Sequence, residues 1–337
     1  MAKLRLPAAP RDPELPGSAG AGPAVDEYGA LAGAPPREGR SLRGVFDNRI
    51  LPWLLLLPAF ATIFALVLYP LVETFWLSFH DAGIPWLRDG TKEFIGVENY
   101  TEIFTDDLYR RVFVTTAAFG IACVLGTMVV GLLVALLLNQ RFRGRSVVAV
   151  ITLLPWAVPA VAAGTVWEWL FDARAGLVNH LLSYLPGVDL IGFAWFNDRW
   201  SAFLAIGIVV VWQSYPFVAV SLLAGFQAIS PEVLEAAKVD GANAWQRLRL
   251  VTLPILWPLV MVLVIISTIW DFKIFDQVFV MTGGGPARST EVVAITTVAE
   301  GFGRRDFGLG AALAVTLFLV LAAITLFYVR MIREETA

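Results

Sequence analysis

Six apolar runs, each long enough to cross a bilayer, constrain this chain more than any other feature. A helix needs about 20 predominantly apolar residues to cross the hydrocarbon core. The runs cover residues 50–79, 113–138, 147–170, 202–224, 256–280 and 309–329. Because backbone polar groups in lipid must be satisfied within the chain, the runs predict an all-α polytopic membrane protein with about six transmembrane helices.

The composition supports this interpretation and excludes several other classes of protein. The chain is 58% hydrophobic and 16% charged, with a mean hydropathy of +0.70, whereas a soluble domain has roughly 45–50% apolar and about 25% charged residues. A net charge of −3, one cysteine and two histidines argue against a disulfide scaffold, a structural metal site and a basic surface for nucleic acid. We therefore expect neither a metal nor a nucleic-acid partner.

The first 49 residues differ from the rest of the chain. They are rich in Ala, Gly, Pro and charge and have no apolar periodicity, which predicts a disordered tail. The apolar run that begins near Ile50 is longer than the core of a signal peptide, so we interpret it as a first transmembrane helix. The predicted domains are thus a tail, 1–49, and a transmembrane domain, 50–337.

The shortest connection between two runs predicts the orientation. It carries Arg141, Arg143 and Arg145 and no acidic residue, and short loops rich in arginine stay on the cytoplasmic side. With an even number of spans, both termini and the loop 225–255 would also be on the cytoplasmic side of the plasma membrane.

The loop 225–255 contains the signals of a first short helix. Ser230 suits the N-cap, Pro231 suits the first helical position, and Gly241 can adopt the left-handed conformation that ends a helix. Two short helices joined at Gly241 would form a rigid elbow, the name used below for residues 225–255.

A second short helix is predicted after this corner. Asn243, with Gln246 three residues later, has the spacing of a capping box, and Pro254 is expected to end the helix. An elbow of this kind, projecting from the membrane, suits docking into the cleft of a partner protein.

The elbow resembles the EAA motif found in the membrane subunits of bacterial binding-protein-dependent ABC importers. The matching residues are Glu235-Ala236-Ala237, Gly241 and Val251-Thr252-Leu253-Pro254. Two residues depart from the family pattern: Val251 replaces an isoleucine, and Leu248 replaces the usual phenylalanine. Further residues resemble the carbohydrate-uptake, MalF/UgpA-type branch: Asp240, Ala242, Pro258, Thr282-Gly283-Gly284-Gly285-Pro286, Thr290, Phe307-Gly308 and Ala311-Ala312.

This resemblance implies a fold and a set of partners. The fold would be that of a type I ABC importer permease, which translocates a sugar or a sugar-like solute. The partners would be a second homologous permease, an ABC ATPase dimer that binds ATP, and an extracytoplasmic solute-binding protein, while the permease itself binds no cofactor. The residues implied in coupling to the ATPase are Glu235, Ala236, Ala237, Asp240, Gly241, Leu253 and Pro254.

Two polar clusters inside the apolar runs are candidates for the substrate path, because charged and polar groups at this depth are costly unless they face water or partners. The candidates are Gln213, Ser214, Tyr215, Trp270, Asp271 and Lys273. Two alternatives stay open: Lys273 could pair with Asp276 inside the membrane, or it could extend to the interface.

Other functions receive less support from the sequence. The glycine run at Gly283 lacks the Gly-Lys-Ser/Thr ending of a phosphate-binding loop, and no catalytic constellation is visible, so we do not expect an enzyme. His80 and His180 are expected at the surface, and Cys123 in the packed interior. The remaining alternatives are a permease of the same family for another solute, such as a glycerol phosphate derivative or an amino acid, and an ion-driven secondary transporter.

Overall fold

The computed structural model describes residues 51–336, so the predicted tail, 1–49, lies outside the described residues. The chain divides into two units between Ile63 and Phe64. In the first unit, the described part is one helix, α2 (Leu51–Ile63). The second unit begins with a π-helical turn, η1 (Phe64–Leu68), followed by α3 (Tyr69–Leu77), and contains every other described element.

The described residues contain five helices that are long and apolar enough to span a membrane, or six if one bent pair is counted. The five cover Pro52–Leu77, Asp107–Asn139, Arg199–Ala228, Ala244–Met281 and Phe307–Met331. The prediction of an all-α chain with about six transmembrane helices is therefore confirmed.

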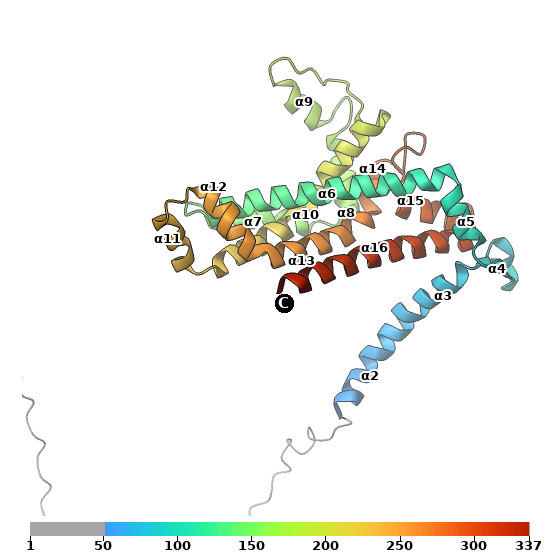
Figure 1. The fold of residues 1–337 in the computed structure, drawn as a ribbon. Helices are drawn as coiled ribbons and strands as arrows, with labels where there is room; N and C mark the ends of the chain where they lie inside the picture. Colours follow the sequence, from blue (N-terminus) through green and yellow to red (C-terminus); the bar gives the residue numbers. More distant parts are fainter. Residues whose placement is uncertain (1–50, 337) are drawn as a thin grey trace, which may run out of the picture. The chain divides into compact units, whose positions relative to one another are not determined.

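Four long helices form the centre of the second unit (Figure 1): α6 (Asp107–Asn139), α10 (Arg199–Ala228), α13 (Leu253–Phe272) and α16 (Phe307–Thr336). Glycines on α6 allow its neighbours to approach closely. A Cβ atom at Gly120 would lie 2.6 Å from the ring of Phe272, and one at Gly131 would lie 2.6 Å from the side chain of Val218. Such small residues are what membrane helices use to pack, because lipid gives no hydrophobic drive to association.

The run 147–170 does not form one straight span. It forms α7 (Arg145–Ala157) and α8 (Ala160–Leu170), whose axes differ by 101°. The break lies at Val158, which is extended, and at Pro159, which has no N–H to continue the helix.

Short elements connect the long helices. A two-stranded antiparallel sheet pairs β1 (His80–Asp81) with β2 (Glu93–Phe94), and α4 (Ile84–Asp89) lies between them. The other short elements are α5 (Glu98–Thr105), α9 (Leu177–Ser183), η2 (Trp195–Asn197), α14 (Asp276–Met281), α15 (Val293–Val298) and η4 (Ala299–Gly303).

The expectation that His80 lies at the surface is wrong, whereas His180 is exposed as expected. His80 is buried because its Nδ1 atom lies 2.7 Å from the carbonyl oxygen of Trp76 and its ring packs on those of Trp76 and Phe94. Its own carbonyl accepts a hydrogen bond from Asn99. The free cysteine, Cys123, is buried in the helical core, as expected.

Candidate functional site

The elbow begins with α11 (Pro231–Val239), which has proline in its first turn, as predicted. Ser230 occupies the N-cap position, but its side chain makes no capping bond to the backbone. Its hydroxyl donates instead to the carboxylate of Glu232. This hydrogen bond lowers the pKa of the Glu232 carboxyl group below its ordinary value. A charged carboxylate at the start of a helix complements the helix dipole, so Glu232 stabilises the first turn although the Ser230 side chain does not cap it.

The corner of the elbow lies at Gly241, which has φ = 82° and is therefore left-handed, as predicted. The turn is closed by two backbone hydrogen bonds, from Gly241 N to Lys238 O and from Ala242 N to Ala237 O, each 3.0 Å long. No atom lies within 4 Å of the place where a Cβ atom would stand. The requirement for glycine at this position is therefore conformational, not steric.

The second helix of the elbow, α12 (Ala244–Arg247), begins with the predicted capping box. Gln246 N donates to Asn243 Oδ1 over 2.9 Å, and Asn243 N donates to Gln246 Oε1 over 2.8 Å. The Arg247 guanidinium donates to Ala242 O over 2.7 Å. These bonds fix the direction in which the chain leaves the corner.

The expectation that this helix ends near Pro254 is wrong. After α12 the chain forms a π-helical turn, η3 (Leu248–Thr252), and continues directly into α13. Pro254 falls in the first turn of α13, where its missing N–H is tolerated. The wider turn at η3 carries the helix past the proline, so the elbow is joined to a membrane helix without a hinge.

The residues implied in coupling lie together on the elbow, and most are exposed. Glu235, Ala236, Asp240, Gly241 and Pro254 are exposed, while Ala237 and Leu253 are half-buried.

The elbow surface also exposes large apolar side chains. Val239 is 87% exposed and Trp245 is 66% exposed. Among the described residues, Glu235 and Asp240 take part in no ion pair. The elbow thus presents apolar side chains and unpaired carboxylates together at one end of the helices (Figure 1).

The first polar cluster contains a structural hydrogen-bond hub. Gln213 on α10 donates from Nε2 to the carbonyl oxygen of Val158 over 2.7 Å, and its Oε1 accepts from Gln277 Nε2 over 2.7 Å. Gln213 therefore joins the break between α7 and α8 to α14. The sequence prediction missed Gln277, although it is a polar residue within the run 256–280.

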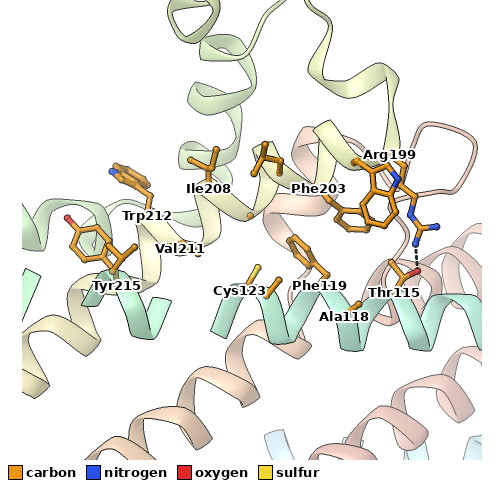
Figure 2. A pocket seen from close by; sticks show the side chains of 15 residues that line it. Thr115, Ala118, Phe119, Cys123, Arg199, Phe203, Ile208, Val211, Trp212 and Tyr215 are labelled. Carbon is orange, nitrogen blue, oxygen red and sulfur yellow. Dashed lines mark hydrogen bonds between the residues drawn. The ribbon is translucent and has the colours of Figure 1, made fainter. Parts of the chain in front are cut away.

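The other members of the two clusters do not converge on one point. Ser214 is half-buried, and Tyr215 lines a groove between α6 and α10 (Figure 2). Trp270 packs against Phe217, with ring centroids 5.2 Å apart. Asp271 is 3% exposed, and its Oδ2 atom has no hydrogen-bond partner among the described residues.

Lys273 is the C-cap residue of α13 and lies where the chain breaks before α14. Its side chain is exposed. Asp276 is also exposed, and the ion pairs of the described residues do not include these two side chains. The intramembrane ion pair between Lys273 and Asp276 is therefore not formed in this structure. Within residues 51–336, no three or more His, Cys, Asp or Glu side chains lie close enough to hold a metal ion.

The chain is similar to known proteins over most of its length. Residues 127–334 match the family described as "Binding-protein-dependent transport system inner membrane component". The chain is 40% identical to the diacetylchitobiose uptake system permease protein DasB of Streptomyces coelicolor, over 84% of this chain and 87% of that protein. It is 34% identical to the trehalose/maltose transport system permease protein MalF of Thermococcus litoralis, over 83% and 92% respectively.

A solved structure agrees with the fold. The chain resembles a chain of a bacterial ABC transporter involved in the import of the acidic polysaccharide alginate, with a TM-score of 0.74. The two are 21% identical, and the similarity covers 88% of this chain and 99% of the other. The match of residues 127–334 and the identity to two uptake permeases show that the chain belongs to the inner membrane components of binding-protein-dependent transport systems, the permease subunits of ABC importers.

Proposed function

We propose that this permease translocates a sugar, and specifically a disaccharide or a similar small saccharide, into the cell. The observation that carries the proposal is the 40% identity, over 84% of the chain, to a permease named for diacetylchitobiose uptake. A second relative, 34% identical, is named for trehalose and maltose. Both names describe disaccharide transport, which supports a saccharide over an amino acid or a glycerol phosphate derivative.

The elbow would be the contact with an ATPase that is a separate subunit. A rigid corner at Gly241, followed by a helix that runs without a hinge into α13, is suited to transmit a movement from a partner to the membrane helices. The exposed side chains of Val239 and Trp245 offer apolar area for docking. Glu235 and Asp240 offer carboxylates to a basic partner.

The elbow end would face the cytoplasm, together with both termini. The arginine-rich connection at Arg141, Arg143 and Arg145 lies between α6 and α7, and α7 lies at the elbow end of the helices (Figure 1). The remaining subunits would be a second permease of the same family and an extracytoplasmic solute-binding protein. The chain itself would bind no nucleotide or other cofactor.

The substrate path would involve the second polar cluster (Trp270, Asp271 and Lys273) more than the first (Gln213, Ser214 and Tyr215). The side-chain amide of Gln213 is already hydrogen-bonded to Val158, at the break between α7 and α8, and to Gln277. In contrast, Asp271 has a carboxylate oxygen without a partner among the described residues, and Trp270 offers an aromatic face. Saccharides are held by aromatic faces and hydrogen-bonding groups. Ser214, Tyr215 and Lys273 are assigned to the same path with less support, because Ser214 is only half-buried, Tyr215 lines the groove between α6 and α10, and Lys273 is exposed.

Uptake measurements test the proposed cargo. The coding sequence is deleted in its source strain, and uptake of labelled diacetylchitobiose, maltose, trehalose, an amino acid and a glycerophosphodiester is compared before and after complementation. Loss of uptake of one of the saccharides, restored by the gene, supports the proposal. Unchanged saccharide uptake with loss of amino acid or glycerophosphodiester uptake contradicts the proposed cargo and leaves the membership of the family intact.

A further inference from the structure

An apolar groove runs along the seam between α6 and α10, and all of its lining residues belong to these two helices. Its volume is about 680 Å³. Figure 2 shows Arg199 at one end of the row of lining side chains and Tyr215 at the other. Apart from these two and Thr115, the lining is apolar or weakly polar, and it includes Ala122, Phe119, Phe203, Ile208 and Trp212.

A second, basic pocket of about 580 Å³ continues the groove at the α5 end of the helices. It is lined by Asp107, Arg110, Arg111, Val114, Thr115 and Arg199, and it shares Thr115 and Arg199 with the groove. Three guanidinium groups thus face one carboxylate. Arg110 pairs with Asp107 over 2.9 Å, and Arg111 donates from Nε to the backbone oxygen of Asp107 over 3.1 Å. The pocket keeps an excess of positive charge after this pairing.

Arg199 stands where the two cavities meet, and its hydrogen bonds are incomplete. Its Nη2 donates to Thr115 Oγ1 over 3.0 Å. Its Nε is buried and has no acceptor within the described residues. The guanidinium lies 5.4 Å from the ring of Trp200 and 5.9 Å from that of Phe203. A buried guanidinium donor without an acceptor is costly. Arg199 is partly exposed and lines the basic pocket, so its Nη donors that are not bonded to Thr115 are available to an anion bound there.

The groove is long enough to hold an acyl chain. It extends along α6 from Thr115 to Val130, and 15 residues of helix rise about 22 Å. Half of the hydrocarbon core of a bilayer is about 15 Å thick. A ligand that fills both cavities therefore needs an anionic head and an apolar tail of at least this length.

We propose that this composite site binds one anionic phospholipid, with its phosphate among Arg110, Arg111 and Arg199 and an acyl chain along the α6–α10 groove. The arginines have the geometry and charge for phosphate oxygens, and the groove offers the acyl chain almost no polar group. A sugar would leave its hydroxyls unpaired against this lining.

Lipid retention after purification tests the site. The full chain, in complex with the subunits that purify with it, is incorporated into vesicles of phosphatidylcholine and phosphatidylglycerol in equal amounts. It is then extracted in mild detergent, and the bound lipids are measured by mass spectrometry. The variants are R110Q/R111Q, which removes two exposed side chains and so uncovers no buried group, and A122F, which fills the groove and keeps the arginines. R174Q, at an exposed arginine outside both pockets, is the matched control.

The proposal predicts that the wild-type chain and R174Q retain phosphatidylglycerol in preference to phosphatidylcholine. R110Q/R111Q should reduce that preference about tenfold, since losing one charge-assisted hydrogen bond alters a binding constant by about this factor. A122F should also lose the bound phosphatidylglycerol. Equal retention of the two lipids by the wild type would overturn the proposal. Full retention by A122F would overturn it too, because the pocket would then bind an anionic headgroup or free anion without the groove.

A photocrosslinker identifies the occupant in intact cells. Benzoylphenylalanine at Ala118, which lines the groove, should yield an adduct with the mass of a phospholipid. An adduct with a second polypeptide would show that another subunit covers the groove, and would contradict the lipid assignment.

Discussion

The side-chain amide of Gln213 donates a 2.7 Å hydrogen bond to the carbonyl oxygen of Val158, at the point where α7 turns into α8. The helix bends by 101° at this point because Val158 is extended and Pro159 has no N–H. A membrane interior supplies no water to a carbonyl freed in this way. Gln213 therefore fixes the break in place, and through Gln277 it connects the break to α14.

Replacing Gln213 by leucine should destabilise the chain by about 1–3 kcal/mol, because the carbonyl of Val158 and the amide of Gln277 would both lose a partner. The midpoint of thermal unfolding in detergent measures the effect. S214A, at the neighbouring half-buried position, is the control and should unfold as the wild type does. Equal midpoints for Q213L and S214A would show that the bond does not hold the break.

Replacing Gly241 by valine should abolish transport while the chain still inserts. The left-handed conformation at φ = 82° costs a side chain about 1–2 kcal/mol, and a branched side chain would also obstruct close docking. Uptake and the ATPase activity stimulated by loaded solute-binding protein are the measurements. G241N should be milder, because asparagine tolerates this conformation.

Gly144 gives a matched control for this prediction. It is left-handed as well, with φ = 87°, and like Gly241 it has no atom within 4 Å of its Cβ position. G144V thus introduces a similar backbone strain outside the elbow, in the connection between α6 and α7, and should retain most of the transport. If G144V and G241V were equally defective, strain alone would explain both variants, and the elbow would not be the coupling element.

The glutamate at position 300 holds two arginines at the end remote from the elbow. Glu300 is 1% exposed, and its carboxylate lies 3.1 Å from Arg304 Nη1 and 3.6 Å from Arg288 Nη2. Removing one partner from a buried pair costs about 3–5 kcal/mol. R304Q should therefore unfold at a clearly lower temperature than E300A, because R304Q leaves the buried carboxylate with one fewer partner, whereas E300A leaves two arginine side chains that are 57% and 36% exposed and can be solvated. Equal unfolding temperatures would contradict a structural role for Glu300.

Thiol labelling tests the orientation in the membrane. Cysteine at Val239 on the elbow, or at Ser146 after the arginine-rich connection, should react with an impermeant reagent only when cells are opened. Cysteine at Tyr184, which is 82% exposed at the C-cap of α9, should react in intact cells. The native Cys123 is buried and should give little background. Reaction of the cysteine at Val239 in intact cells would show that the elbow faces outward, and would contradict the predicted orientation.

What the sequence predicted well depends on contacts between near neighbours. The capping box at Asn243 and the left-handed Gly241 follow from residues three to five positions apart, so their pattern is visible in the chain itself. The bond from Gln213 to Val158 joins residues 55 positions apart, and no local pattern indicates it. Likewise, His80 is buried partly by a local contact with Trp76 and partly by the contact with Phe94 in the paired strand, and the sequence does not indicate the second of these.

The continuation of the helix through Pro254 shows a second limit of local rules. A proline usually marks a boundary, but at the first turn of α13 it costs no hydrogen bond, and a π-helical turn precedes it. The choice between ending and continuing depends on how the elbow packs on the membrane helices, which the sequence does not state.

The most direct test of the account is uptake by proteoliposomes that contain this chain with a second permease, an ATPase and a solute-binding protein. The account predicts that labelled disaccharide accumulates only when ATP is present on the side of the elbow, and that collapsing the ion gradients leaves the uptake unchanged. Accumulation driven by an ion gradient in the absence of ATP would contradict it.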